Sequence, residues 1–207
     1  MLALLIAAGF FMWLLSQPRE EPNPENSGRL PVLLVHGWLG SAYSMIPLVN
    51  RFRLAGWPAF AVPGLNFNTN NVEDLVNDSQ AIVEYVNSFD TKVNIVGYSL
   101  GGVSGRYACK ILGISNKVAN FVSVDSPQHG AEFYGVGTYL YPGSPLLTQL
   151  NLGDETPSPT HWTAIAGREF GDSAKLTGAN NVFLDKSHIE LIFSDEAFNI
   201  ALQAIGG

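Results

Sequence analysis

The chain has 207 residues, close to the usual size of one domain; 46% of them are hydrophobic and 14% are charged. This balance excludes an intrinsically disordered chain, which needs high charge and few apolar residues. The formal net charge of −7 and the lack of a Lys/Arg cluster argue against nucleic-acid binding, because such proteins need clustered cations to displace counterions from phosphates. The single cysteine, Cys109, excludes an intrachain disulfide and a cysteine-based metal site.

The first 16 residues are almost entirely apolar. The run from Leu2 to Leu15 is shorter than the ~20 residues that span a bilayer comfortably, and it is nearer in length to the apolar part of an export signal. We interpret residues 1–16 as a signal or a short membrane anchor, with a buried N-terminal helix as the alternative. We therefore predict an exported protein, which is anchored by its N-terminus or, if the segment is cleaved, secreted or periplasmic.

Residues 17–29 have the composition of a linker, with three prolines, three glutamates and no periodicity. Residues 30–207 contain no internal repeat and are predicted to form one folded domain.

Within this domain, apolar runs alternate with segments that have helical spacing. This alternation predicts an α/β fold with a mostly parallel central sheet and helices on both faces. Residues 131–160 interrupt the alternation and are interpreted as a loop or small cap over the site. The expected strands are 31–35, 58–62, 93–96, 118–124, 162–166 and 181–184, and the expected helices are 44–55, 72–87, 101–112 and 195–205.

A G-x-S-x-G pattern spans residues 97–101. An apolar strand runs into it and a segment with helical spacing follows, which is the strand–turn–helix context of a nucleophile elbow. Such a turn strains the backbone of its serine and places it at a helix N-terminus, where free N–H groups stabilise developing negative charge. The pattern predicts Ser99 as a nucleophile, and the alternative is an ordinary loop serine.

Other short motifs stand in order around this elbow. His36-Gly37-Trp38-Leu39-Gly40 follows the first strand, Ser126-Pro127-Gln128-His129-Gly130 follows the strand after the elbow, and Gly178-Ala179-Asn180-Asn181-Val182 precedes a histidine. In order and spacing these motifs resemble the bacterial lipases and esterases of the α/β-hydrolase superfamily, both the small lid-poor group and its triacylglycerol lipase relatives. The resemblance covers residues 30–207 and implies an α/β-hydrolase fold with a Ser-His-Asp triad.

The same resemblance implies where a reaction oxyanion would be held. In such enzymes two backbone N–H groups bind it, one from the residue after the nucleophile and one from the loop after the first strand. In this chain those residues are Leu100 and Trp38. No metal or organic cofactor is required.

The chain has four histidines, and we assign the catalytic role to His188. It follows the last strand, on the side of the sheet where active groups gather, and it alone gives the order serine, acid, histidine. By resemblance His36 holds the oxyanion loop and His129 belongs to a structural motif. His161 precedes a strand and so lies at the wrong end of the sheet.

The triad acid is expected after strand 162–166, where relatives usually have an aspartate. Asp172 is preferred and Glu169 is the alternative in this segment. Asp125 is a third choice, because it ends the strand after the elbow, a position that some animal lipases use.

These assignments predict a serine hydrolase that cleaves carboxylic esters, with an ester or lipid as substrate and an acyl-enzyme on Ser99. Apolar and aromatic residues between Phe133 and Leu152 could line an acyl pocket or pack a cap. The alternatives are an acyltransferase, thioesterase or amidase with the same triad, or a catalytically inactive binding module at a membrane. The sequence leaves acyl-chain preference and oligomeric state open.

Overall fold

The computed structural model describes residues 28–67, 71–132 and 137–206. The predicted signal or anchor, residues 1–16, and nearly all of the predicted linker lie outside the described residues. Within the described ranges, no helix combines the length and apolar character needed to cross a membrane. Export and membrane association therefore stay predictions from the sequence.

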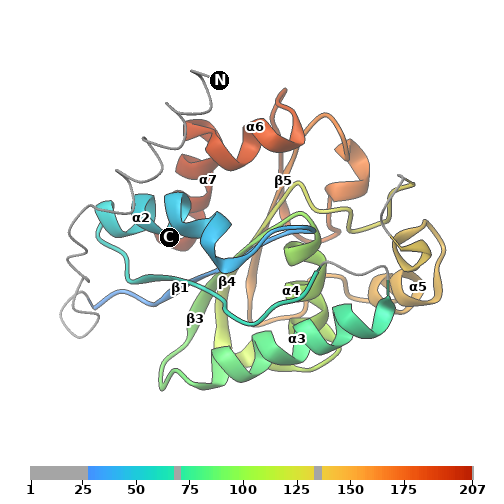
Figure 1. Cartoon of the computed structure of the whole chain (residues 1–207), viewed down its shortest axis with the longest axis horizontal. Helices are drawn as coiled ribbons and strands as arrows, with labels where there is room; N and C mark the ends of the chain where they lie inside the picture. Colours follow the sequence, from blue (N-terminus) through green and yellow to red (C-terminus); the bar gives the residue numbers. More distant parts are fainter. Residues whose placement is uncertain (1–27, 68–70, 133–136, 207) are drawn as a thin grey trace, which may run out of the picture.

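The centre of the domain is a six-stranded sheet in which every neighbouring pair is parallel (Figure 1). Its strand order is β2-β1-β3-β4-β5-β6. The predicted α/β class and the predicted parallel sheet are confirmed, and each expected strand forms within a few residues of its predicted position. The strands are β1 (Val32–Val35), β2 (Ala59–Ala61), β3 (Val93–Tyr98), β4 (Val118–Val124), β5 (His161–Ala166) and β6 (Asn180–Phe183).

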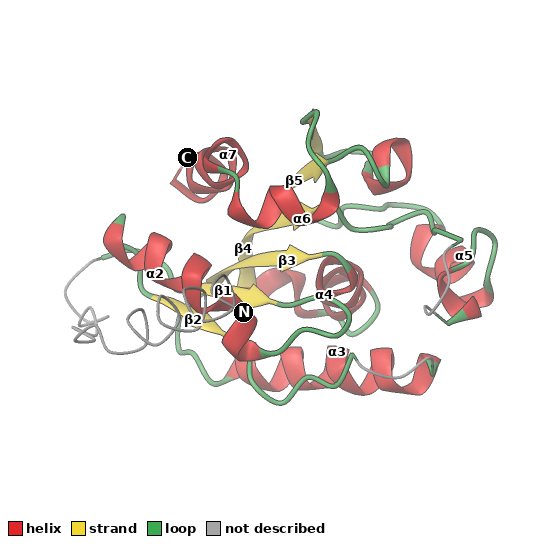
Figure 2. Ribbon diagram, turned by 45° about the horizontal axis from the view of Figure 1, so that its top comes forward, coloured by secondary structure: helices red, strands yellow, loops and turns green. Residues whose placement is uncertain are grey.

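Helices cover both faces of this sheet (Figure 2). Helices α3 and α4 lie on one face, and α2 and α7 lie on the other. The α-helices are α2 (Ile46–Leu54), α3 (Val72–Asn87), α4 (Leu100–Lys110), α5 (Pro145–Asn151), α6 (His188–Phe193) and α7 (Asp195–Gly206), and the short 3-10 turns are η2 (Ala42–Met45), η3 (Ile114–Lys117), η4 (Thr138–Leu140) and η5 (Gly171–Ala174).

Strand β1 shows why its sequence is a continuous apolar run. Leu33 and Val35 pack into the apolar cluster beneath α3 and α4, whereas Val32 and Leu34 pack into the cluster beneath α2 and α7. All four side chains are fully buried. A strand covered on both faces has no solvent-facing positions, so the polar alternation of a half-exposed strand is absent.

The segment that interrupts the alternation, residues 131–160, contains the short helix α5, which the sequence analysis did not predict. Pro145 begins this helix, and the Ser144 side chain accepts a hydrogen bond from the backbone N–H of Leu147. Leu146, Leu147 and Leu150 are buried in the cluster beneath α3 and α4. These leucines therefore pack the domain core.

Candidate active site

Ser99 stands at a strained turn between β3 and α4. Its backbone has φ 56° and ψ −127°, in the left-handed region that side chains disfavour. The flanking glycines allow the turn. A Cβ at Gly97 would lie 2.6 Å from the Cα of Gly102, and one at Gly101 would collide with the carbonyl oxygens of Val35 and His36. The expected strand–turn–helix geometry of the elbow is thus present.

The loop after β1 packs directly against Ser99. A Cβ added to Gly37 would lie 2.7 Å from the Ser99 Cβ and 3.2 Å from its Oγ. Trp38 follows Gly37 in this loop, and Leu100 follows Ser99 at the first turn of α4. The two residues predicted to bind an oxyanion therefore approach the serine from two different elements.

His188 meets a carboxylate at the carboxyl edge of the sheet. Its Nδ1 lies 2.8 Å from Oδ2 of Asp125, whose side chain is fully buried directly after β4. The other oxygen of Asp125 accepts the backbone N–H of Gly167 at 2.6 Å. With Nδ1 donating to the carboxylate, Nε2 is the nitrogen left to accept a proton.

The structure does not bring Asp172, the preferred acid, to the His188 ring. Asp172 lies in η5 with its side chain 93% exposed, and it pairs with Lys175 at 2.6 Å. Its side chain thus pairs with Lys175 in solvent, and in the described residues no hydrogen bond joins Asp172 to His188. Asp125, the third choice from the sequence, holds the ring instead.

Glu169, the second candidate acid, contacts the backbone of His188 and leaves its ring to Asp125. Its Oε2 accepts the N–H of His188 at 2.6 Å. His188 thus contacts two carboxylates, that of Asp125 through its ring and that of Glu169 through its backbone N–H.

Two aromatic residues that sequence reasoning did not single out surround the His188 ring. Tyr98 stacks on it with a centroid separation of 4.6 Å and an interplanar angle of 23°, and Phe170 meets it edge-on at 5.1 Å. The Tyr98 hydroxyl also donates to the His188 carbonyl at 2.8 Å. The only sequence signal for Tyr98 is its place before the serine of the elbow.

The serine and histidine come from elements far apart in the chain, and in the described residues no hydrogen bond joins Ser99 Oγ to the His188 ring. Catalytic hydrogen bonds are often open in unliganded sites and close when substrate binds. The site thus contains a hydroxyl, an imidazole and a buried carboxylate, the three groups that acyl transfer uses.

The other histidines have different surroundings. His36 is buried, donates from Nδ1 to the carbonyl oxygen of Gly37 at 2.9 Å, and packs edge-on against Phe67. Burial lowers the pKa of His36 below its ordinary value of 6.5. His129 pairs with Glu155 at 2.9 Å, and His161 is exposed at the start of β5. None of these contacts places these three histidines at Asp125.

A buried arginine that the sequence analysis missed supports the loop after Asp125. Arg106 of α4 is fully buried, and it donates to the Gln128 side chain and to the carbonyl oxygen of Glu155. Burial lowers the pKa of Arg106 to about 10. The network therefore connects α4, the helix that follows Ser99, to the segment that follows Asp125.

Among the described residues there is no group of three or more His, Cys, Asp or Glu side chains that could hold a metal ion.

No protein-family model matches the chain. Solved structures do. Lipase B of Aspergillus fumigatus has a TM-score of 0.74 and 16% identity over 92% of this chain, which spans 55% of that lipase. A Bacillus licheniformis lipase in its mature form has a TM-score of 0.69 and 16% identity, over 91% of this chain and 96% of that chain. A polyneuridine aldehyde esterase has a TM-score of 0.56 and 18% identity, over 85% and 99% respectively. Because the sequence identities are this low, the structural similarity shows the fold alone, and it confirms the predicted α/β-hydrolase fold.

The strained turn predicts an unusual order of stabilities. The free energy of unfolding of Ser99→Gly should be about 1 kcal/mol higher than that of Ser99→Ala, so the glycine variant is the more stable. Glycine relieves the strain of the positive φ, and both variants lack the hydroxyl. Urea unfolding of the two variants measures this difference. At Ser123, which lies in β4, the order should be reversed, with the alanine variant the more stable. An alanine variant at residue 99 as stable as the glycine variant would contradict strain at the elbow.

The buried His36 predicts a loss of stability in mild acid. Because its pKa is lower in the folded protein, the unfolded chain binds the proton first as the pH falls below 6.5. Between about pH 7.5 and about pH 5.5 the wild type should lose up to about 1 kcal/mol of unfolding free energy more than His36→Asn, which keeps an N–H donor but does not titrate. His161→Asn, at an exposed site, is the control and should behave like the wild type. Equal losses in all three proteins would refute the prediction.

Proposed function

We propose that this protein is a serine hydrolase that cleaves carboxylic esters, with Ser99 as nucleophile, His188 as general base and Asp125 as the triad acid. One observation carries the proposal. The His188 ring is hydrogen-bonded to the fully buried carboxylate of Asp125. Asp125 directly follows β4, which pairs with β3, and β3 leads into the strained turn at Ser99.

The first half of the reaction transfers the acyl group to the enzyme. Ser99 Oγ attacks the ester carbonyl carbon while Nε2 of His188 takes its proton. Asp125 keeps the imidazole in the tautomer with Nδ1 protonated and stabilises the imidazolium. The C–O bond to the alcohol then breaks, His188 returns the proton to the leaving oxygen, and the acyl group remains on Ser99.

Water completes the cycle. It attacks the acyl-enzyme carbonyl, gives a proton to His188, and releases the carboxylic acid as the proton returns to Ser99. In both halves the tetrahedral oxyanion is bound by the backbone N–H groups of Trp38 and Leu100. Each such donor typically lowers the barrier by about 3 to 4 kcal/mol, because it is already oriented when the charge forms.

The structural neighbours support an ester as substrate, because they include proteins described as lipases and an esterase. The fold alone hosts many chemistries, so the proposal rests on the site. Acyl transfer, thioester or amide cleavage, and an inactive binding module are outcomes that the experiments below separate from ester hydrolysis.

The primary test is hydrolysis of p-nitrophenyl esters with short to long acyl chains, with Ser99→Ala as the matched control. We expect turnover in the wild type and a loss of about 10⁴-fold or more in kcat in the variant, because the nucleophile is removed while the backbone donors remain. Labelling by a fluorophosphonate probe should be lost in the same variant. A folded wild type that neither reacts with the probe nor cleaves any ester would refute the proposed hydrolase.

The choice of acid has its own test. Asp125→Asn should lower kcat by about 10³ to 10⁴-fold, because the amide no longer holds the ring in the productive tautomer. Asp172→Asn is the control on the surface and should keep wild-type kcat. The assay is steady-state hydrolysis of the best p-nitrophenyl ester from the panel. A loss confined to Asp172→Asn would overturn the assignment made from the geometry.

A further inference from the structure

Tyr98 touches His188 at two separate points. Its ring lies against the imidazole, 4.6 Å between centroids, and its hydroxyl donates to the His188 carbonyl at 2.8 Å. One side chain thus contacts both the reacting ring and the main chain that carries it. We propose that Tyr98 is a positioning residue that holds the His188 imidazole in register with Ser99. This inference rests on the proposed function.

The place of Tyr98 in the chain gives the contact its meaning. It is the last residue of β3 and immediately precedes Ser99. In register it pairs with Val124 of β4, the residue before Asp125. The backbone of Tyr98 is therefore fixed by the middle of the sheet, between the nucleophile and the acid. The Tyr98 side chain therefore links the position of the turn at Ser99 to the position of His188.

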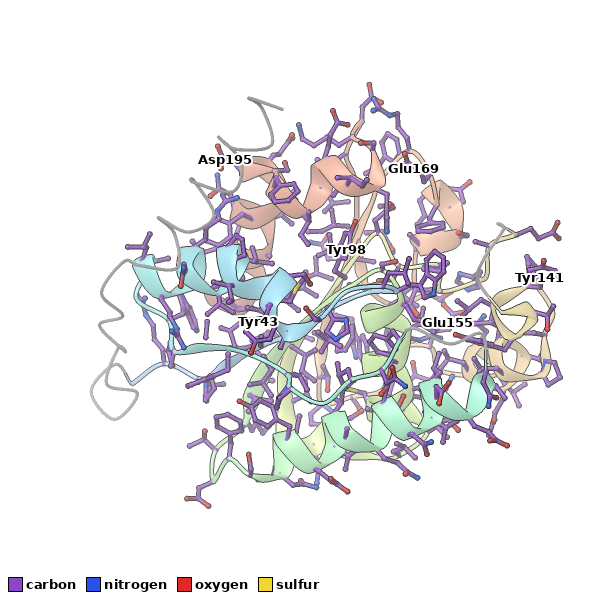
Figure 3. The ribbon with its side chains drawn as sticks, in the orientation of Figure 1. Tyr43, Tyr98, Tyr141, Glu155, Glu169 and Asp195 are labelled. Carbon is purple, nitrogen blue, oxygen red and sulfur yellow. The ribbon has the colours of Figure 1, made fainter. Side chains whose placement is uncertain are left out.

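Glu169 provides the second anchor of the same histidine. Its carboxylate accepts the His188 N–H at 2.6 Å from the loop after β5, so the two polar main-chain groups of His188 are held from two different elements. Both Tyr98 and Glu169 are labelled in Figure 3. His188 begins α6, a helix of six residues whose start is closed by a capping box between Ser187 and Glu190.

The charge state of Tyr98 suits a permanent donor. Burial, with the nearby carboxylates of Asp125 and Glu169, raises the pKa of Tyr98 far above its ordinary value of 10.0. The hydroxyl therefore stays protonated at any pH at which the enzyme would work. The ring face also attracts a cation, so it stabilises His188 more when the imidazole carries the proton taken from Ser99.

Charged side chains from several elements lie around His188. Asp125 faces it from the loop after β4 and Glu169 from the loop after β5. On α6 itself, Glu190 pairs with Arg168 at 3.0 Å. Replacing Tyr98 with an apolar residue leaves all four in place, so a change in the pH profile reports the lost ring and hydroxyl.

The kinetic test separates the two contacts of Tyr98. Tyr98→Phe keeps the ring and should lower kcat by about 5- to 10-fold, with KM little changed, because one hydrogen bond to His188 is lost. Tyr98→Leu loses both contacts and should lower kcat further. In this variant the acidic limb of the kcat/KM profile should move to lower pH by about half a pH unit. Glu169→Gln weakens the second anchor and should lower kcat less than Tyr98→Leu.

Matched controls guard against a general loss of packing. Tyr85→Phe and Glu84→Gln remove the same groups from α3, away from the site, and should leave kcat and the pH profile unchanged. Thermal unfolding by circular dichroism identifies any variant that does not fold, and Tyr98→Phe is the milder replacement if Tyr98→Leu fails.

A second readout does not need turnover. The chain has four histidines, so their Cε1–H resonances can be resolved by NMR and His188 assigned with His188→Gln. Tyr98→Leu should remove the part of the His188 ring-current shift that the Tyr98 ring causes and leave the part from Phe170, whereas Tyr98→Phe should keep both. Wild-type kcat, pH profile and His188 resonance in Tyr98→Leu would overturn the positioning role, while an inactive Ser99→Ala would leave the hydrolase proposal standing. An active Ser99→Ala would instead refute the hydrolase, and the NMR shift would then decide whether Tyr98 holds the ring.

Discussion

The buried carboxylate of Asp125 is the group on which the arrangement of the site depends. An ionised carboxylate without water is costly unless each oxygen has a partner. Here one oxygen accepts the Gly167 N–H and the other accepts the His188 ring. Gly167 comes from the loop after β5 and His188 from the start of α6, which follows β6, so the Asp125 carboxylate connects three strand ends. The hydrogen bond that satisfies the Asp125 carboxylate therefore also fixes the orientation of the His188 ring.

The loop after β1, which is proposed to bind the oxyanion, has a support of a different kind. Leu39 donates to the Phe67 carbonyl at 3.5 Å, and the Phe67 ring packs against His36. The neighbouring N–H of Asn66 is accepted by Asp78 of α3 at 2.8 Å. Burial raises the pKa of Asp78, and its second oxygen has no partner in the described part of the chain. The loop beside Ser99 is thus supported by the apolar ring of Phe67 and, through Asn66, by the carboxyl of Asp78, whose ionisation is costly.

Sequence reasoning succeeded where a single segment carries its own signal. The apolar run Val32–Val35 indicated a strand buried on both faces, and the glycines around Ser99 indicated a tight strand-to-helix turn. It failed for α5 and α6, of seven and six residues, because so few residues complete too few turns to show a period. It also missed Tyr98, since the contact with His188 joins residues 90 positions apart and the motif leaves that position free.

The acid proposed for the triad shows most clearly why sequence order cannot decide geometry. Parallel strands end at one edge of a sheet with about 4.8 Å between neighbours, so a carboxylate after β4 and one after β5 can both reach the same imidazole. Asp125 and Asp172 both lie between the serine and the histidine, and both preserve the order that the pattern requires. What separates them is burial. Asp125 is fully enclosed and needs the N–H groups it receives, whereas Asp172 stands in solvent beside Lys175. That difference arises from how the loops after β4 and β5 pack against each other, a relation that lies between segments and in neither one alone.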